Sequence, residues 1–585
     1  MPRASRRMPP LLAASAALLT VILLATLVAA CGEEEVSPLA PTETGTIEQL
    51  EFTADAGSAT CYLYFPTDPF FAGTVMPITF VFPAETVADA DAALDYLVET
   101  GIKDILEASQ TFGLVFTPID SAGYTEADLE ILNSAKAQFS DRGHIAGGYI
   151  EAEGGVVTSD SGTLYAGSRF RNYIYADGAG ADFIAKYATK RLPYVLEYSD
   201  GGKITFNHLA AGMALFNVSE PADPGEEINP VPAFLVNPGD GVVESFEAIN
   251  GEDYPTVSKK GDKITPKLAY EAWELMSEWQ RTECTPGTYG IFLMTKYITD
   301  YEEAGLDYNA HLWTAIPETG SDYKHTYFTW ASADGGDAKR PAIMLFHGRD
   351  NSALYLAQTS DWLRVALQED LVVISVQHSG VTDETGTLID PATPTDIKNL
   401  LDYLLTDEDL NIDPTRVYAS GFSMGSMLTS SLANEYPTSF AGFAPCNPAG
   451  PMDAGGVLCP VFSITGLTDP LAGPRSALAK GPVDLGLTLT NNGAPLDPTV
   501  DPDDKDTYKD ANWGYAPDSS EEIVRYGGTN VYTLNYYESE DGIVYTVFCA
   551  VTNLSHETIG ATSWLQWDFL QHFSRNADGS ITYTE

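Results

Sequence analysis

Basic residues are scarce in this chain of 585 residues. It carries 31 Lys and Arg against 82 Asp and Glu, which gives a formal net charge of −51 at pH 7. Proteins that bind nucleic acid neutralise phosphates with Lys and Arg, and anionic lipid surfaces attract clusters of the same residues. The composition therefore argues against nucleic-acid binding and against electrostatic docking on a membrane. A strongly acidic surface favours solubility and identifies no partner.

Cysteine is also rare, with six residues in the whole chain. The five that follow Cys31 leave at least one thiol unpaired. Cys446 and Cys459 are our first candidates for a disulfide because they are close in sequence, and Cys61–Cys284 is the second. No Cys or His spacing is typical of a metal site, and we expect no cofactor. A chain of this length can bury large cores without such cross-links.

Long apolar runs are absent except at the N-terminus. Residues 1–30 combine three arginines with an apolar stretch over 11–28 and small residues directly before Cys31, which is the pattern of a signal peptide. The cysteine at that point resembles the lipobox of bacterial lipoproteins. The resemblance implies an exported bacterial lipoprotein, lipidated at Cys31 and anchored to a membrane at the cell surface or in the periplasm by that lipid alone. An uncleaved transmembrane anchor is the alternative, because about 18 apolar residues approach the length that spans a bilayer.

The mature chain begins with a polar segment. Residues 31–47 are rich in Glu, Pro, Thr and Ser, a composition typical of a flexible tether. The length of the remainder favours more than one domain.

A nucleophile motif stands in the C-terminal half, where buried strands alternate with helical segments as they do around a parallel sheet. A strand predicted over 416–420 runs directly into G-F-S-M-G at 421–425, and a helix is expected over 426–435. This is G-x-S-x-G in a strand–turn–helix context, which exposes a serine hydroxyl at a helix N-terminus. The flanking glycines remove Cβ atoms that would collide in so tight a turn. We expect Ser423 to be a nucleophile.

A catalytic acid should follow Ser423 in the chain if the order is that of α/β-hydrolases. Asp469 comes directly after the buried strand predicted over 460–465, where a triad acid belongs. Asp453 is nearer in sequence but lies in a Gly- and Pro-rich loop, so it ranks second. Because Asp is common in turns, Asp469 has an ordinary turn role as its alternative.

A catalytic histidine should come later still. Only two histidines follow the candidate acid. His556 lies in a loop after the strand predicted over 543–551, at the carboxyl end where a general base is presented. His572 lies on the last amphipathic helix. The pattern favours His556.

These motifs resemble those of exported esterases related to polyhydroxybutyrate depolymerases and to feruloyl or acetylxylan esterases. The resemblance covers roughly residues 322–578 and rests on L-F-H-G at 345–348, the serine motif, the Gly466-x-x-Asp469 turn and the Ser555-His556 loop. It implies hydrolysis of carboxylic esters on polymers. The Arg349-Asp350 loop and the long acidic segment 470–540 depart from the family pattern, and both affect substrate specificity.

The mechanism that the resemblance implies is two-step acyl transfer by Ser423, His556 and Asp469. Backbone N–H groups of Met424 and of the Gly348–Arg349 turn would form the oxyanion hole.

The N-terminal half repeats the strand and helix patterns of the C-terminal half in the same order. Aligning the two places Gly180 opposite Ser423, Pro83 opposite His347 and Asp262 opposite His556. We therefore expect an α/β fold class with two tandem α/β-hydrolase-like domains, each a mostly parallel sheet flanked by helices. The predicted divisions are a signal peptide, a tether, a degenerate non-catalytic domain and a catalytic domain, over 1–30, 31–47, 48–283 and 284–585. Two unrelated α/β domains are the alternative.

Three functions remain open. The favoured one is a membrane-tethered serine esterase that acts on a polyester or an acylated polysaccharide. A serine peptidase of the same fold would share the triad. A non-enzymatic, polymer-binding surface lipoprotein would not need the triad, and the Ser, Asp, His order argues against this function.

Overall fold

The computed structural model describes most of the chain from residue 39 onward. The predicted signal peptide, Cys31, most of the predicted tether and Cys284 lie outside the described residues. Within the described part, every helix is too short or too polar to cross a membrane. The described residues are 39, 42–67, 76–109, 111–139, 149–150, 156–157, 167–187, 194–197, 203–206, 210–223, 230–252, 254–281, 291–293, 298, 301–316, 322–336, 338–349, 353–380, 390–447, 452–467, 469, 473, 481–499, 501, 504, 513–525, 530–552, 554 and 556–584.

The N-terminal half forms a sheet in which eight of the described strands are paired. All are parallel except β2, which runs antiparallel to both of its neighbours. In spatial order the strands are β1 (Thr46–Ala54), β2 (Gly57–Phe65), β4 (Phe112–Phe116), β3 (Met76–Phe82), β7 (Gly167–Asp177), β10 (Gly212–Phe216), β11 (Ala233–Val236) and β12 (Thr256–Lys259).

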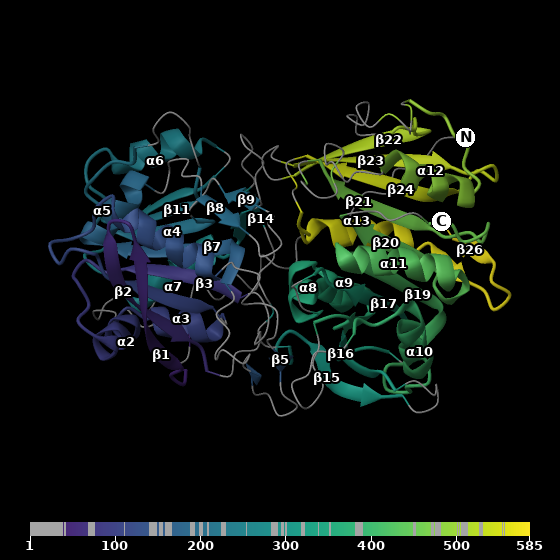
Figure 1. Cartoon of the computed structure of the whole chain (residues 1–585), viewed down its shortest axis with the longest axis horizontal. Helices are drawn as coiled ribbons and strands as arrows, with labels where there is room; N and C mark the ends of the chain where they lie inside the picture. The colour runs from purple at the N-terminus through teal and green to yellow at the C-terminus, as the bar shows by residue number, and fades with distance from the viewer. Residues whose placement is uncertain are drawn as a thin grey trace, which may run out of the picture.

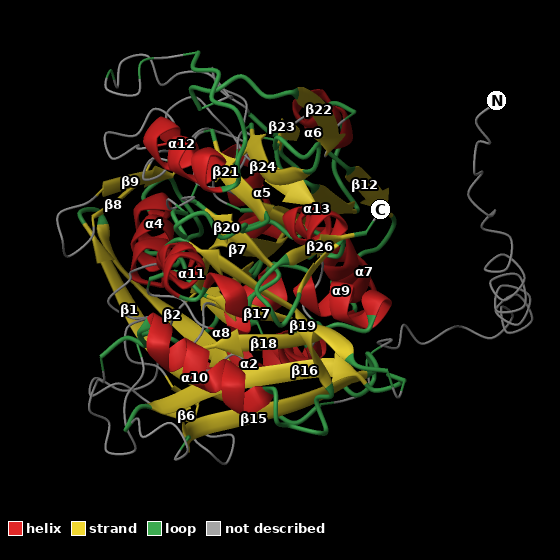
Figure 2. Cartoon of the chain, turned by 90° about the vertical axis from the view of Figure 1, so that its right-hand side faces the viewer, coloured by secondary structure: helices red, strands yellow, loops and turns green. Residues whose placement is uncertain are grey.

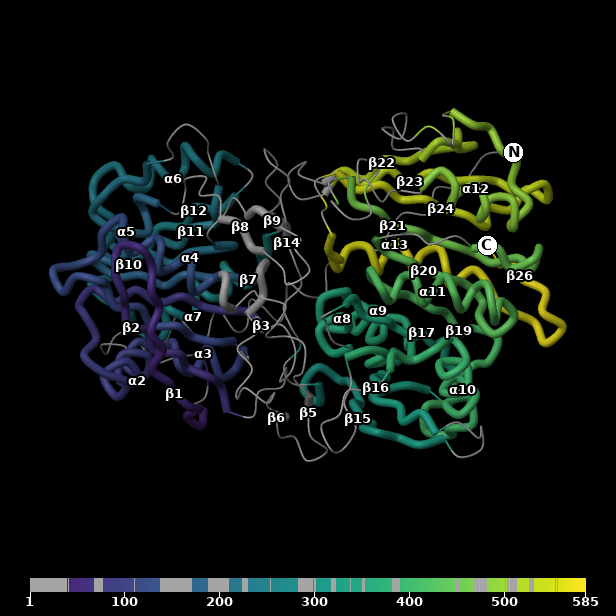
Figure 3. The backbone as a smooth tube through the Cα atoms, viewed as in Figure 1, coloured from purple at the N-terminus to yellow at the C-terminus, as the bar shows by residue number. Residues whose placement is uncertain are grey.

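The C-terminal half forms a second sheet with the same order over its first eight positions. An antiparallel hairpin extends it at one edge, beside its last parallel strand (Figure 3). The strands are β15 (Leu306–Ala315), β16 (Lys324–Ser332), β18 (Val372–Val376), β17 (Arg340–Phe346), β19 (Ile412–Phe422), β20 (Gly442–Cys446), β21 (Val461–Gly466), β24 (Val544–Val551), β23 (Asn530–Glu538) and β22 (Ser519–Arg525).

The two sheets also share local irregularities. The register between β3 and β7 shifts after Met76, and the register between β17 and β19 shifts after Arg340, the first residue of the corresponding strand. Across the shift, β7 and β19 each advance by five residues, while β3 and β17 each advance by two. Shared order, direction and register shift favour a repeated domain over two unrelated α/β domains, so the expected fold class is confirmed.

Helices cover both faces of each sheet, because the strands alternate apolar side chains between two cores. In the first domain the helices on one face are α2 (Ala90–Glu99), α3 (Ile102–Ala108) and α7 (Pro266–Met276), and those on the other are α4 (Asp128–Phe139), α5 (Gly178–Tyr187) and α6 (Val242–Asn250). In the second they are α8 (Ala353–Thr359), α9 (Trp362–Glu369) and α13 (Ala561–Leu570), against α10 (Pro394–Leu404) and α11 (Met424–Glu435). Figure 2 shows α10 and α11 in front of the second sheet.

Short elements complete the fold. The last helix of each domain leads into a strand that pairs with one further strand, so the repeat extends past residue 283. These strands are β13 (Trp279–Arg281) with β14 (Ile291–Leu293), and β25 (Phe573–Arg575) with β26 (Ile581–Tyr583). The remaining elements are β5 (Tyr149–Ile150), β6 (Val156–Val157), β8 (Tyr194–Glu197), β9 (Lys203–Phe206), α12 (Gly481–Asn491) and the 3-10 turn Pro437–Ser439.

Two buried tyrosines fix the equivalence of the repeats. Tyr173 on β7 and Tyr418 on β19 each pair with the first residue of the next parallel strand. Their hydroxyls donate to the carbonyls of Trp279 and Phe573, at 2.9 and 2.8 Å, which begin β13 and β25. The same hydrogen bond thus ties the same two elements in each domain.

This equivalence corrects the sequence alignment by two residues. Five residues after each tyrosine stand Gly178 and Ser423, with φ of 50° and 53°. Gly180, which the alignment placed opposite Ser423, corresponds instead to Gly425: a Cβ added to either would overlap the carbonyl of the facing strand's last residue. The alignment erred because both positions fall in a Gly-rich turn, where sequence alone does not set the register.

The predicted Cys446–Cys459 disulfide does not form. Both are free, buried thiols. Cys446 pairs with Ile464 across β20 and β21, whereas Cys459 lies five residues before Ile464, a separation of roughly 16 Å along the strand. A disulfide needs Cα atoms within about 7 Å. Cys61 is also a free thiol.

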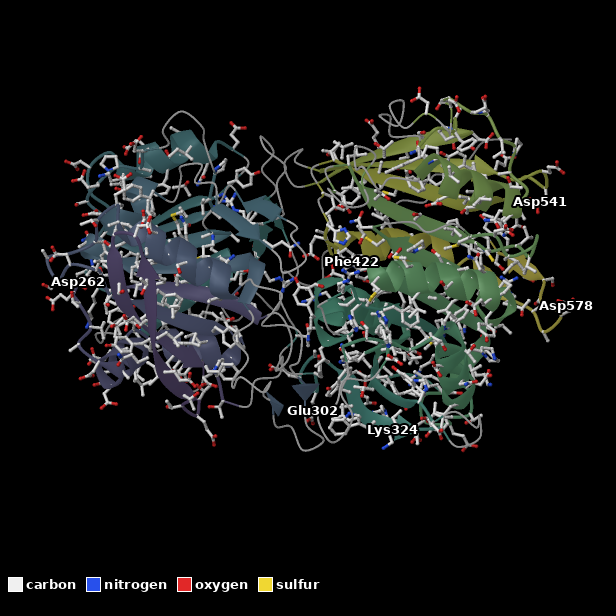
Figure 4. All side chains as sticks on the ribbon, viewed as in Figure 1. Asp262, Glu302, Lys324, Phe422, Asp541 and Asp578 are labelled. Carbon is white, nitrogen blue, oxygen red and sulfur yellow. The ribbon has the colours of Figure 1, made fainter. Side chains whose placement is uncertain are left out.

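The two domains form two lobes side by side (Figure 1). The largest cluster of buried apolar side chains includes residues of both sheets. The lobes have the same orientation along the long axis of the molecule: Phe422, at the end of β19, lies on the flank facing the N-terminal lobe, whereas Asp262, beyond the end of β12, lies on that lobe's outer flank (Figure 4).

Candidate active site

Ser423 stands in a strained turn between β19 and α11. Its φ of 53° and ψ of −115° are unfavourable for a residue with a side chain. The turn closes only because its glycines lack side chains: a Cβ on Gly425 would overlap the carbonyl of Phe346, and a Cβ on Gly421 would overlap the carbonyl of Gly425. The serine hydroxyl is thereby held at the N-terminus of α11.

The structure brings the three candidate triad residues together. Nε2 of His556 is 2.8 Å from Oγ of Ser423, and Nδ1 of His556 is 2.8 Å from Oδ2 of Asp469. The Asp469 side chain is fully buried, while 12% of the His556 side chain is exposed. Because a carboxylate can only accept, Nδ1 donates a hydrogen bond to Asp469. Nε2 is then unprotonated and accepts a hydrogen bond from the serine hydroxyl.

The second-ranked residues lie elsewhere. Asp453 is exposed, and its backbone N–H donates to Oδ1 of Asn434. His572 follows α13, where its Nδ1 donates to the carbonyl of Thr584 at 2.8 Å. Neither takes part in the Ser423 network.

The expected oxyanion donors lie beside the serine. Met424 begins α11, so its N–H has no partner within the helix. A Cβ on Gly348 would come within 3.2 Å of Cβ of Ser423, which shows how closely this turn approaches the nucleophile. Nδ1 of His347 donates to the Gly348 carbonyl at 2.7 Å. Because a trans peptide directs its C=O and N–H to opposite sides, this bond turns the Arg349 N–H away from His347.

A second histidine supports this turn and was not anticipated from the sequence. His378 follows β18, and its Nε2 donates to the His347 carbonyl at 2.7 Å. Burial lowers the pKa of His378 to about 4. Burial, followed by the proximity of His378, lowers the pKa of His347 well below 6.5. Both rings are therefore neutral near pH 7. The position of His378 could have indicated its role. It lies two residues after a buried strand, and His347 lies one residue after another.

Asn447 was also missed, although it directly follows β20. It is fully buried, with φ of 45°, and its side chain contacts the loops that carry Asp469 and His556. Sequence patterns do not show which of many Asn residues joins two loops.

Cys446 lies close to the site without the properties of a nucleophile or a metal ligand. Among the described residues, no group of His, Cys, Asp and Glu is arranged to hold an ion. The burial of Cys446, close to Asp469 and Glu557, raises its thiol pKa well above the ordinary 9.0. This cysteine is therefore a neutral packing residue rather than a second nucleophile.

Comparison with known proteins gives partial matches. No protein-family model matches the chain. A 133-residue stretch is 29% identical to a bifunctional acetylxylan esterase/xylanase of Neocallimastix patriciarum, and covers 22% of this chain and 19% of that protein. A 157-residue stretch is 34% identical to NocK of Nocardia uniformis subsp. tsuyamanensis, a protein named as an esterase, and covers 25% of this chain and 44% of that one. The sequence relatives are esterases. The chain spans less than half the length of each.

Comparison with solved structures also gives partial matches. An acetyl xylan esterase from Aspergillus awamori is 11% identical, with a TM-score of 0.31, and the match covers 45% of this chain and 99% of that one. A thermostable esterase is 22% identical, with a TM-score of 0.23, over 32% of this chain and 51% of that one.

Proposed function

We propose that this protein is a serine esterase that hydrolyses carboxylic esters borne by a polymer, either a polyester or an acylated polysaccharide. The observation that carries the proposal is the continuous hydrogen-bonded series Ser423–His556–Asp469 at a strained strand–helix turn. The esterase relatives support the same chemistry. The N-terminal sequence supports export and lipidation at Cys31, which would hold the enzyme at a membrane.

The geometry accounts for acyl transfer in two steps. His556 takes the proton of Ser423 as Oγ attacks the ester carbonyl, and Asp469 stabilises the resulting imidazolium. The backbone N–H groups of Met424 and Arg349 stabilise the oxyanion, at about 3–4 kcal/mol for each donor. His556 then returns the proton to the departing alcohol. Water attacks the acyl-enzyme by the same route, with His556 as general base, and releases the acid.

The N-terminal domain serves this enzyme without chemistry of its own. At the nucleophile position it carries Gly178, which has no hydroxyl, and Pro83 follows β3 where His347 follows β17. The sequence contains no histidine between 209 and 310, so the loop beyond β12 supplies no base. We assign to this domain a packing or binding role beside the catalytic lobe.

A fluorophosphonate probe tests the proposal, because it reacts covalently with activated serines. Wild type should be labelled and should hydrolyse acetyl or longer-chain activated esters. Ser423→Ala should lose labelling and lose kcat by about 10⁴-fold or more, while Ser439→Ala, outside the site, should behave as wild type. Absence of wild-type labelling would refute the proposal. Cleavage of peptides but not of esters would identify a peptidase instead.

A further inference from the structure

One buried side chain joins two loops of the site. Oδ1 of Asn447 accepts the backbone N–H of Gly466 at 2.8 Å, and its Nδ2 donates to the carbonyl of Glu557 at 2.9 Å. Gly466 ends β21 and lies three residues before Asp469. Glu557 directly follows His556. The amide therefore spans the loop that presents the acid and the loop that presents the base.

The backbone around Asn447 reaches the third loop. The carbonyl of Cys446 accepts the N–H of Ser423 at 3.0 Å, and the N–H of Asn447 donates to the carbonyl of Ile464 at 3.0 Å. The end of β20 is thus bonded to the nucleophile turn, to β21 and, through the Asn447 side chain, to the base loop.

The residue type suits both demands at this position. Its φ of 45° lies in the left-handed region, which Asn tolerates better than most side chains. Its amide has one donor group and one acceptor, and the two contacts need one of each. Gly would fit the backbone but make neither side-chain bond.

We propose that Asn447 is a positioning residue, which holds the acid loop and the base loop at the separation that the Ser423–His556–Asp469 hydrogen bonds require. This inference rests on the proposed esterase function. A displacement of about 1 Å between reacting groups can cost about 100-fold in rate, so a bond that fixes both loops affects turnover more than substrate binding.

The N-terminal domain has a similar but less buried asparagine at the corresponding strand end. Asn217 follows β10 with φ of 53°, and its Oδ1 accepts from Asn237 at 2.8 Å. Its Nδ2 donates to a carboxylate oxygen of Asp177 at 2.9 Å and to the carbonyl of Asp262 at 3.3 Å. Asn217 thus also joins the loops beyond two neighbouring strands. It provides a matched control, because its removal loosens equivalent loops that carry no triad.

The decisive comparison pairs Asn447→Ala with Asn217→Ala in the full chain. Asn447→Ala should lower kcat for an activated ester by about 100-fold with KM changed less than about threefold. Asn217→Ala, whose bonds are more exposed, should lower the melting temperature by a smaller amount and leave kcat within about twofold of wild type. Hydrogen–deuterium exchange should accelerate in 464–469 and 556–560 only in the Asn447 variant.

A second variant, Asn447→Asp, gives a pH signature. A protonated carboxyl can still donate to the Glu557 carbonyl and accept from the Gly466 N–H. An ionised one cannot donate and repels the Glu557 carbonyl. Its kcat/KM should therefore fall as pH rises through the new carboxyl's pKa, an alkaline limb that wild type and Asn217→Ala lack.

The outcomes separate this inference from the function on which it rests. If wild type takes no fluorophosphonate, the esterase proposal fails, and loop exchange in Asn447→Ala still decides whether the residue couples the loops. If wild type is active but Asn447→Ala keeps kcat within about twofold, or its loops exchange as in wild type, the positioning role is overturned.

Discussion

Ser423 differs from most of the other residues that have a positive φ angle. Among the described residues, nine that are not glycine have positive φ, and six of these are Asn or Asp, which tolerate that region through short polar side chains. Ser423 belongs to neither type, and its ψ of −115° lies outside the left-handed helical region. Strain of this kind persists only where surrounding contacts impose it, and it concentrates at functional sites.

Buried histidines make the stability of the catalytic domain pH-dependent. The folded pKa of His378, about 4, lies below its ordinary 6.5 because burial disfavours the charged ring. The unfolded chain therefore binds the proton first, and stability falls as pH drops from about 6.5 to about 4, by roughly 3 kcal/mol for this group. His378→Gln, whose amide can still donate to His347, should show a smaller drop in melting temperature over that window.

The control is His572→Gln, which lies away from this pair and should retain the wild-type pH slope. An unchanged slope in His378→Gln would contradict the assignment.

Residues differ in how far the sequence reveals them. Motif context and chain order predict Ser423, Asp469 and His556 as site residues, because a strand end, a tight turn and a late histidine can be recognised in the sequence itself. Asn447 and His378 act through contacts between loops about 20 to 110 residues apart. No local pattern records such contacts, so only the folded chain shows them.

At the scale of elements, an arginine secures the strand that follows the last helix of each domain. Nε, Nη1 and Nη2 of Arg575 on β25 donate to the carbonyls of Phe440, Gly579 and Leu458 at 2.7–2.9 Å. Arg281 on β13 donates to the carbonyls of Ala210 and Pro230, both at 2.6 Å. Four of these five carbonyls precede equivalent strands, so the arginine closes each domain in the same way.

Removing either arginine should destabilise its own domain. A hydrogen bond to a charged group contributes about 1.5–3 kcal/mol, and its loss leaves buried carbonyls unpaired. Arg575→Met should lower the free energy of unfolding of the catalytic domain by at least about 3 kcal/mol, which heat inactivation of ester hydrolysis would report. Arg281→Met should lower the temperature of one unfolding transition in calorimetry. It should change the temperature of heat inactivation less than Arg575→Met does. Equal shifts in inactivation would argue against separate domains.

The sequence predicts several of the parallel strands, but it does not reveal the helix and the hairpin that are inserted between two of them. The strands predicted over 460–465 and 543–551 correspond to β21 and β24 within one residue at each end, because strands buried on both faces read as unbroken apolar segments. No helix or strand is predicted over 470–540. This segment contains α12 and the β22–β23 hairpin, and the exposed residues 519–522 of β22 lack the apolar pattern of a buried strand.

For the whole molecule, two lobes of one topology face the same direction, with the catalytic flank directed at the non-catalytic lobe (Figure 4). The two lobes share their sheet order over eight strands, yet Gly178 stands in one where Ser423 stands in the other. We therefore expect that a serine at this turn, without a histidine beside it, gives no activity.

Restoring that serine tests the statement. Gly178→Ser, placed in a Ser423→Ala background, should accept no fluorophosphonate and hydrolyse no activated ester, because no histidine from the loop beyond β12 faces it. Labelling of the double variant at position 178 would show that the N-terminal domain retains a base and that its non-catalytic assignment is wrong.

Matching strand order has a consequence for how the chain reaches its native state. Neighbouring domains of like topology can misassemble during folding by exchanging corresponding elements. Here β3 and β17 occupy the same place in their sheets, yet at successive positions Thr79 and Phe80 stand where the other has Ile343 and Met344. An exchanged strand would force the aromatic ring of Phe80 into space shaped for methionine. We therefore expect the different side chains of the two cores to disfavour pairing between the domains during folding.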